Sequence, residues 1–239
     1  IMDNELTNGR KHGLEKTLTA LREIAVETNK EWSAIFSVPQ STAITCVKPS
    51  GTVSQLVDSS SGIHPRHSSF YVRTVRGDNK DPLTQFMIDS KIPNEPDFMK
   101  PDTQTVFSFP MKSPKKSVVR NDMTAIEQLE MWLVYQRHWC EHKPSVTVSV
   151  RDEEWMEVGA FVFKHFDEMS GVSFLPHSDH TYQQAPYQDC TEAVYNDFSS
   201  KFTHIDWDKF TDYEKEDNTN SSQTFACSGD SCEIVDIGA

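Results

Sequence analysis

The segment from Val146 to Leu175 constrains the fold of this chain more than any other. Val146 to Val150 alternates apolar and polar residues, as a half-buried strand does. A helical pattern starts near Asp152, and Gly171 is expected to stop it before a second strand, Val172 to Leu175. Two strands joined in this way form a βαβ unit, in which the strands are parallel and the crossover is right-handed. We therefore predict an α/β protein that binds ligands at the carboxyl ends of its strands.

Further helices and strands are expected on either side of this unit. Gly13 to Phe36 carries leucines at helical spacing, and Thr124 to Glu127 has the capping-box pattern before an apolar stripe that runs to about Trp139. Proline is frequent from Asp78 to Lys116, where Thr105 to Phe109 is the only convincing strand. That stretch is otherwise expected to run over the surface.

A second informative segment, Ser41 to Leu56, combines a β-rich run with a tight turn that can open a helix. The turn consists of Pro49, Ser50, Gly51 and Thr52. A strand that ends in a glycine-containing turn presents free backbone N–H groups, and a following helix adds the positive end of its dipole. The two hydroxyl groups are further donors. The pattern suggests a phosphate site, although turns of this composition also occur in ordinary loops.

Charge and composition exclude several classes of function. A net charge of -13 argues against direct nucleic-acid binding, which needs clustered lysine and arginine. No apolar run approaches the roughly 20 residues that span a bilayer. Five cysteines, of which only the last two are closely spaced, do not resemble a secreted disulfide framework, so a reducing, cytoplasmic location is expected. Because the sequence begins at Ile1 with no signal-peptide pattern, we expect an internal piece of a longer protein.

The end of the chain differs in composition from the rest. Helical periodicity fades beyond about Asn196, and the stretch from Asp206 to Asp236 holds nine acidic residues and two lysines. Asn218 to Gln223 is too polar to pack into a core. We therefore divide the chain into a domain of residues 1–196 and an acidic, flexible tail of residues 197–239.

The tail carries Cys227 and Cys232, here called the tail dithiol. The two cysteines flank Gly229 and are close enough in sequence to form a disulfide of low strain. An exposed, easily reduced disulfide exchanges with other thiols. Two idle thiols and half of a zinc site are alternatives, although zinc needs four ligands and the tail offers no other ligand nearby. The residues alone leave these alternatives open.

Several segments follow one another in an order that is itself informative. They read TAITCVKPSGTVSQL followed by SGIHPRHSSFYVRTVRGDNKDPL, then WCEHKPSVTVSV, GVSFLP, TYQQAPYQ and the terminal CSGDSC. Together they resemble the C-terminal part of the catalytic chain of ribonucleotide reductases, and most of all the adenosylcobalamin-dependent branch that reduces ribonucleoside triphosphates. The resemblance implies the C-terminal portion of a ten-stranded α/β barrel with a mobile C-terminal tail.

The resemblance also implies a role for each candidate site. The turn from Pro49 to Thr52 would hold the phosphates of the substrate ribonucleoside triphosphate. His64, Arg66 and Tyr182 lie in two regions that would contribute to the adenosylcobalamin site. The tail dithiol would reduce the active-site disulfide and would itself be reduced by thioredoxin or a similar protein. No metal site is predicted, because the histidine pairs lack a recognised ligand framework.

The family reaction needs a radical-forming cysteine in an Asn-Pro-Cys-x-Glu loop, and this sequence has no such loop. The resemblance therefore implies that the chain works with the upstream N-terminal part of the same enzyme and is inactive alone. Two alternatives stay open. One is a large-chain fragment of a metal-dependent two-subunit reductase, and the other is a non-catalytic nucleotide-binding or thiol-exchange module from a split gene.

Overall fold

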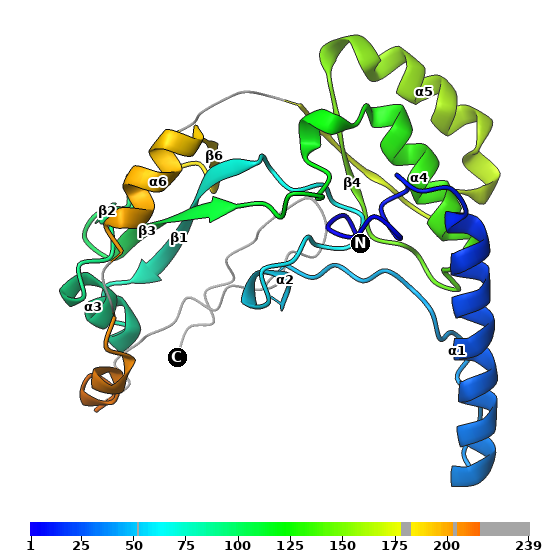
Figure 1. Cartoon of the computed structure of the whole chain (residues 1–239), viewed down its shortest axis with the longest axis horizontal. Coiled ribbons are helices and arrows are strands. Elements are labelled where there is room, and N and C mark those ends of the chain that lie inside the picture. Colours follow the sequence, from blue (N-terminus) through cyan, green and yellow to red (C-terminus); the bar gives the residue numbers. More distant parts are fainter. Residues whose placement is uncertain (52, 178–182, 203–204, 216–239) are drawn as a thin grey trace, which may run out of the picture. The chain divides into compact units, whose positions relative to one another are not determined.

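The computed structural model describes residues 1–51, 53–177, 183–202 and 205–215. The chain divides into two compact units, each made of two separate stretches of sequence. Unit 1 consists of Ile1–Tyr71 and Lys112–His180, and unit 2 of Val72–Met111 and Thr181–Ala239. Figure 1 labels the helices and strands of both units. Within the described residues, none of the helices is long and apolar enough to cross a membrane.

Unit 1 is built around two helices that pack on each other. α1 (Leu14–Phe36) confirms the helix predicted from leucine spacing, and its buried leucines lie in its first half. α4 (Ala125–His138) begins at the predicted capping box. The Thr124 hydroxyl accepts a hydrogen bond from the Glu127 N–H (3.1 Å), and the Glu127 carboxylate accepts one from the Thr124 N–H (2.8 Å). These reciprocal bonds satisfy donors that a helix start leaves unpaired.

Trp132 on α4 is the largest fully buried side chain of the described residues. Its indole N–H donates to the Pro144 carbonyl at 3.0 Å, so its polar atom is satisfied inside the core. Leu129, Val148 and Val150 are completely buried in the same cluster. Burial of apolar side chains of this size contributes about 1.5–3 kcal/mol each. The core of unit 1 therefore joins α4 to the strand that carries the two valines.

The predicted βαβ unit is present in unit 1. β4 (Thr147–Val150) pairs in parallel with β5 (Ser173–Pro176). The connection contains the 3-10 helix η2 (Asp152–Glu154) and the helix α5 (Trp155–Lys164). The α/β class is confirmed, whereas the ten-stranded barrel stays an expectation, because the described strands form one four-stranded and one two-stranded sheet. Unit 1 also contains the short helix α2 (Val53–Leu56) and the 3-10 helix η1 (Arg120–Asp122).

Helix α5 ends earlier than predicted. The sequence places its stop at Gly171, but a separate 3-10 turn, η3 (Phe166–Glu168), lies between the end of α5 and the glycine. The Glu168 carboxylate accepts hydrogen bonds from Arg137 at 2.6 and 2.9 Å and lies 2.6 Å from the Nδ1 atom of His165. These partners lower the pKa of Glu168 to about 2. We attribute the early end of the helix to these contacts, which hold the chain in the tighter turn.

The strand predicted before the phosphate turn is wrong, because residues 41–48 belong to no described sheet. The Glu141 carboxylate accepts hydrogen bonds from the N–H groups of Ile44 (2.7 Å) and Thr45 (3.2 Å). The Glu141 N–H in turn donates to the Thr45 carbonyl at 2.8 Å. One glutamate therefore satisfies backbone groups that a neighbouring strand would otherwise bind.

Unit 2 contains a four-stranded sheet with the strand order β2-β3-β1-β6. Its strands are β1 (Phe70–Asp78), β2 (Asn94–Pro96), β3 (Gln104–Lys112) and β6 (Tyr187–Asp189). Its helices are α3 (Pro82–Asp89), α6 (Glu192–Ser200) and the 3-10 helix η4 (Trp207–Asp212). β3 contains the strand predicted over residues 105–109. The sequence analysis does not predict β1, α3 or α6, and the boundary that it places after residue 196 falls inside α6.

The last described residues pack on α3. Phe86 is 3% exposed, and its ring centroid lies 5.3 Å from that of Trp207 and 5.5 Å from those of Phe210 and Tyr213. The Tyr213 hydroxyl also donates to the Asp89 carboxylate at 2.9 Å. The segment around η4, which the sequence analysis assigns to the tail, therefore contacts a helix of unit 2.

Candidate functional site

The predicted phosphate turn lies in unit 1, directly before α2. Pro49 and Gly51 are exposed, Ser50 is half-buried, and Thr52 lies outside the described residues. A Cβ atom built on Gly51 would meet no other atom within 4 Å. The backbone of the turn is therefore open at the glycine, so a ligand can approach its peptide groups closely.

The helix that follows the turn is shorter than the phosphate hypothesis assumes. α2 has only four residues. Asp58 then adopts a left-handed conformation (φ 46°), and the Ser59 N–H donates to the Ser54 carbonyl at 2.8 Å, which closes the helix. One turn of helix aligns few peptide dipoles, so α2 adds little positive potential. The phosphate hypothesis therefore depends on the N–H and hydroxyl groups of the turn itself.

Two serines that the sequence analysis does not single out bind Ser50. The Ser54 hydroxyl donates to the Ser50 carbonyl, and the Ser54 N–H donates to the same oxygen at 3.2 Å. The Ser61 Oγ atom accepts hydrogen bonds from the Ser50 hydroxyl (3.0 Å) and from the Ser50 N–H (3.4 Å). Ser61 therefore holds the two proposed phosphate donors of Ser50 in place, and a phosphate would share these donors with Ser61. The only signal in the sequence is the serine-rich run that contains Ser61.

Ser61 belongs to a loop of residues 58–66, here called the bracing loop, which packs closely on the segment before the turn. Gly62 has a φ of 52°, and a Cβ atom on it would lie 2.9 Å from the Cγ1 atom of Val47. Only glycine fits this position without strain, because a side chain would meet both an unfavourable backbone conformation and a steric clash.

Gly62→Ala is expected to lower the free energy of unfolding by about 2–5 kcal/mol, because a left-handed alanine costs about 1–2 kcal/mol and an overpacked contact about 1–3 kcal/mol. Urea denaturation measures the change. Gly159→Ala on α5 is the matched control, since its Cβ atom would meet nothing within 4 Å and alanine favours a helix. A Gly62→Ala chain as stable as the unmodified one would contradict the close contact with Val47.

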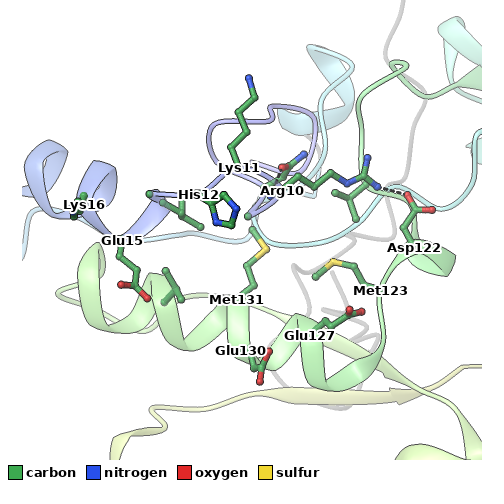
Figure 2. Close-up of a pocket in the computed structure, with 16 residues that line it drawn as sticks. Arg10, Lys11, His12, Glu15, Lys16, Asp122, Met123, Glu127, Glu130 and Met131 are labelled. Atoms are coloured by element: carbon green, nitrogen blue, oxygen red, sulfur yellow. Dashed lines mark hydrogen bonds and ion pairs between the residues drawn. The ribbon is translucent and has the colours of Figure 1, made fainter.

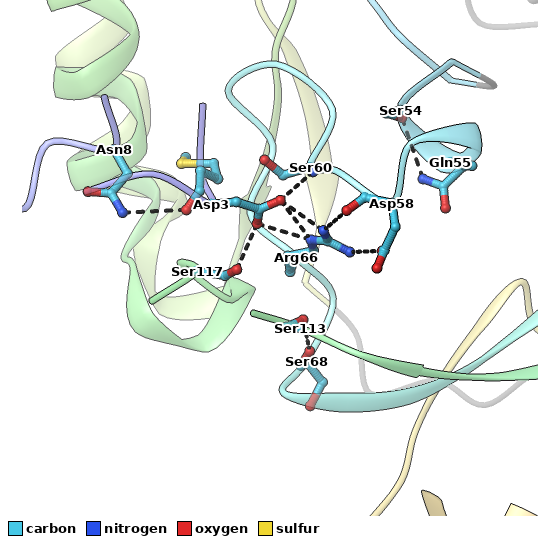
Figure 3. A network of polar contacts seen from close by, with 11 residues as sticks. Asp3, Asn8, Ser54, Gln55, Asp58, Ser60, Arg66, Ser68, Ser113 and Ser117 are labelled. Atoms are coloured by element: carbon cyan, nitrogen blue, oxygen red, sulfur yellow. Dashed lines mark hydrogen bonds and ion pairs between the residues drawn. The ribbon is translucent and has the colours of Figure 1, made fainter. Parts of the chain in front are cut away.

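Arg66 is the centre of a buried polar network that fixes the bracing loop (Figure 3). Its side chain is 5% exposed. The guanidinium donates to the Asp3 carboxylate from Nε (3.0 Å) and Nη2 (2.8 Å), and to the Asp58 carboxylate from Nη1 (2.9 Å). Nη2 also donates to the Asp58 carbonyl at 2.6 Å. Burial opposes the charge of Arg66, but these hydrogen bonds outweigh it and raise the pKa of the group.

The predicted cofactor contact of Arg66 receives no support from this arrangement. Every guanidinium nitrogen donates to Asp3 or Asp58, and almost none of the side chain reaches the surface. The Asp3 carboxylate is also occupied, by the Ser117 hydroxyl (2.7 Å) and the Ser60 N–H (2.7 Å). Arg66 therefore stabilises the bracing loop, and each of its guanidinium nitrogens already has a carboxylate partner.

His64, the second predicted cofactor contact, uses both of its ring nitrogens inside unit 1. Its Nδ1 atom lies 2.7 Å from the Ser61 carbonyl, and its Nε2 atom lies 3.0 Å from the Thr147 backbone nitrogen at the start of β4. A carbonyl only accepts and a backbone N–H only donates, so the ring is neutral with its proton on Nδ1. Burial lowers the pKa of His64, and the bond to Ser61 offsets this effect in part.

The lowered pKa of His64 predicts a loss of stability in acid. The ordinary value is 6.5, so below about pH 6.5 the unfolded chain takes up a proton that the folded chain resists. The free energy of unfolding should therefore fall with pH, at no more than about 1.4 kcal/mol per pH unit for this one group. Urea denaturation at pH 7.5 and 5.5 should show a smaller fall for His64→Asn than for the unmodified chain. Equal falls would contradict the neutral bridge.

The second predicted cofactor region is described only in part. Tyr182 lies outside the described residues. Nearby, Gln184 has a φ of 59° and is buried. Its side-chain nitrogen donates to the Glu95 carboxylate (2.9 Å) and the Pro96 carbonyl (2.8 Å), and its oxygen accepts from the Phe98 N–H (2.8 Å). Gln184 thus ties this segment to β2 within unit 2.

The tail dithiol, Cys227 and Cys232, also lies outside the described residues. The described cysteines are Cys46, Cys140 and Cys190, all with free thiols. Burial raises the pKa of Cys140 to about 11, which suppresses the thiolate that exchange chemistry needs. Among the residues that the structure covers, no group of histidine, cysteine or acidic side chains is placed to hold a metal ion.

Unit 1 also has an open cavity of about 780 Å³ at the start of α1, lined by none of the predicted site residues (Figure 2). Of its basic lining residues, Arg10 and Lys11 come from the segment that leads into α1 and Lys16 lies in the first turn of α1, while Glu127 and Glu130 lie on α4. Arg10 reaches across to Asp122 in an ion pair of 2.7 Å that is largely exposed. The cavity is separate from the phosphate turn.

Curated proteins similar to this chain share one name. A probable adenosylcobalamin-dependent ribonucleoside-triphosphate reductase of Dictyostelium discoideum is 29% identical over 215 residues, which are 87% of this chain and 27% of that protein. The adenosylcobalamin-dependent ribonucleoside-triphosphate reductase of Euglena gracilis is 28% identical over 194 residues, 80% of this chain and 27% of that protein. A reductase of the same name from Levilactobacillus brevis is 26% identical over 181 residues, 74% of this chain and 24% of that protein. No family model matches the chain.

The fold has a counterpart among solved structures. The crystal structure of a B-12 dependent (class II) ribonucleotide reductase superposes with a TM-score of 0.73 and 22% sequence identity over 84% of this chain and 28% of that one. The chain spans about a quarter of the length of the curated relatives that it matches, in agreement with the resemblance to a C-terminal part. This chain is thus similar in sequence to adenosylcobalamin-dependent ribonucleoside-triphosphate reductases, and its fold is similar to that of part of a class II ribonucleotide reductase.

Proposed function

We propose that this chain is part of an adenosylcobalamin-dependent enzyme that reduces ribonucleoside triphosphates to 2′-deoxyribonucleotides. The observation that carries the proposal is the similarity over 215 residues to a reductase of that name. The alternative of a metal-dependent two-subunit reductase receives no comparable support, because the relatives cited above are named as adenosylcobalamin-dependent. A cytoplasmic location is part of the same proposal.

Within this enzyme, the chain would bind the substrate phosphates through Pro49, Ser50, Gly51 and Thr52. The open backbone at Gly51 supports this role, because phosphate oxygens can approach the peptide groups closely there. The N–H and hydroxyl of Ser50 are held in position by Ser61. Because both groups donate to Ser61, a phosphate would share or take over these hydrogen bonds while Ser61 keeps Ser50 in position.

The tail dithiol is proposed to supply electrons, and the rest of the enzyme the radical chemistry. This sequence lacks an Asn-Pro-Cys-x-Glu loop, so the radical cysteine would reside in the N-terminal part, and the isolated chain is expected to be inactive. Thioredoxin or a similar protein is the proposed reductant of Cys227 and Cys232.

Adenosylcobalamin, when bound to the enzyme, would supply the radical that starts the reaction. The described residues do not fit a direct contact at His64 or Arg66, whose polar atoms bind other parts of unit 1. A contribution of this chain to the cofactor surface therefore rests on the region around Tyr182, which stays a prediction.

The test is an activity assay on the complete reductase that contains this sequence. Deoxynucleotide formation from a ribonucleoside triphosphate should require adenosylcobalamin and a thioredoxin system, and no separate radical-generating subunit. Activity that depends on such a subunit instead would favour the metal-dependent class. A chain that binds nucleotides or exchanges thiols but supports no deoxynucleotide formation under either condition would favour the non-catalytic module.

A further inference from the structure

We propose that His64 and Arg66 are positioning residues for the phosphate turn, which they hold through the bracing loop and Ser61. The inference deepens the proposed function and rests on it, because it assumes that the turn binds the substrate phosphates. It also replaces the direct cofactor contact predicted for both residues.

The first support comes from Arg66, which fixes the start of the bracing loop. Its Nη2 atom donates to the Asp58 carbonyl at 2.6 Å, and its partner Asp3 accepts from the Ser60 N–H at 2.7 Å. Both bonds involve a charged side chain, and such bonds are about twice as strong as neutral ones. The Asp58 carbonyl and the Ser60 N–H, which lie shortly before Ser61 in the bracing loop, are thus both bound by the ion pair between Arg66 and Asp3.

The second support comes from His64, which fixes the carbonyl of Ser61 itself. The ring lies between that carbonyl and the N–H of Thr147. Thr147 is the first residue of β4, whose valines belong to the core of unit 1. The bracing loop is therefore attached to a rigid element, and the attachment point is the residue that binds Ser50.

The third support is the contact of Gly62 with Val47, which stands two residues before Pro49. Residues 58, 60, 61 and 62 are thus each held by a separate contact. The Ser61 hydroxyl projects from this fixed backbone and binds the hydroxyl and backbone nitrogen of Ser50. A binding site holds its geometry when the groups that support it are themselves locked.

The experiment measures KM, kcat and adenosylcobalamin affinity for variants of the complete reductase. Ser61→Ala removes the last link and should raise the KM for the ribonucleoside triphosphate about 3- to 10-fold, the effect of one hydrogen bond, with kcat nearly unchanged. Arg66→Lys, which cannot make the forked contacts, should act in the same direction. The affinity for adenosylcobalamin should stay the same in both variants.

Two substitutions of His64 sharpen the test. His64→Asn keeps a donor near the position of Nδ1 for the Ser61 carbonyl but loses the acceptor for the Thr147 N–H, so it detaches the bracing loop from β4 and its KM should rise. His64→Gln reaches toward Thr147 and loses that donor, so its KM should rise. His142→Gln and Arg10→Lys are matched controls, because His142 is exposed and Arg10 pairs with Asp122, which belongs neither to the turn nor to the bracing loop.

Each outcome bears on a different claim. Gly51→Val alters the turn itself, so an unchanged KM for this variant would remove the proposed phosphate site and the inference together. A raised KM for Gly51→Val with a normal KM for Ser61→Ala and His64→Gln would overturn the positioning role alone. A lower affinity for adenosylcobalamin with a normal KM would restore His64 and Arg66 as cofactor contacts. Melting temperatures of all variants separate these effects from unfolding.

Discussion

Replacement of Cys227 and Cys232 by serine is expected to abolish thioredoxin-supported turnover of the complete reductase while leaving a single turnover intact. The first turnover uses electrons already stored in the active-site thiols. Each later turnover needs those thiols to be regenerated from a disulfide, and the tail dithiol is the proposed source of the two electrons. The expected loss in steady-state rate is therefore close to complete.

In the proposed thiol–disulfide exchange, two electrons pass from the tail dithiol to the active-site disulfide in two steps. One tail thiolate attacks the active-site disulfide, and the S–S bond breaks as a mixed disulfide and one free thiol form. The second tail cysteine then attacks the mixed disulfide, which releases the other active-site thiol and leaves Cys227 and Cys232 joined. Two electrons pass to the active site, and reduced thioredoxin restores the tail by the same chemistry. Serine can perform neither attack.

Cys190→Ser is the matched control, since its thiol is half-buried and free. This variant should keep both the single turnover and the steady-state rate. A small dithiol that enters the active site directly should restore multiple turnovers to the double variant. Loss of the single turnover together with the steady-state rate would assign the tail cysteines to the chemical step and refute the shuttle.

Local signals in the sequence predict several elements correctly. The leucine spacing of α1 and the capping box of α4 each depend on residues within a few positions of one another. The parallel pair β4 and β5 follows from one alternating run, one helix and one further apolar run. In these segments the local conformational preference agrees with the tertiary environment, so the sequence pattern alone predicts the element.

Elements whose sequence pattern is interrupted or short are not predicted from the sequence. β1 includes Arg73 and Arg76, which interrupt its apolar pattern, and Arg76 is held by Asp97 in an ion pair of 2.6 Å. α3 has a readable start, since Asp81 caps it and Pro82 is its first residue, but it has only eight residues. The 3-10 turn that follows α5 is bound by Arg137, which lies in a different helix. Such contacts have no local pattern.

The candidate site divides in the same way. The turn chemistry of Pro49 to Gly51 can be recognised locally, and the structure leaves its backbone open as the phosphate hypothesis requires. The support of the turn cannot be recognised, because Arg66 and Asp3 are 63 residues apart in sequence and His64 and Thr147 are 83 apart. His64 and Arg66 lie close in sequence to the predicted phosphate turn, so the sequence alone suggests that they contact a ligand. Only their hydrogen-bond partners show that both side chains bind other parts of unit 1.

Gly51→Val is expected to raise the KM for the ribonucleoside triphosphate by at least about tenfold, with little change in kcat at saturating substrate. A branched side chain on the exposed face of the turn would occupy the space through which phosphate oxygens reach the peptide N–H groups. Binding of the triphosphate would weaken in the ground state and in the transition state alike, which is why KM changes and kcat does not.

The structure makes this variant unusually informative, because its folding cost is small. A Cβ atom on Gly51 meets nothing within 4 Å, and the residue is not among the glycines with a positive φ. Gly159→Val is the matched control, since its Cβ atom is equally unobstructed and lies on α5, outside the turn. Similar melting temperatures for the two variants, with a raised KM for Gly51→Val alone, would assign the loss to the ligand and not to the fold. A normal KM for Gly51→Val would mean that the substrate phosphates bind elsewhere.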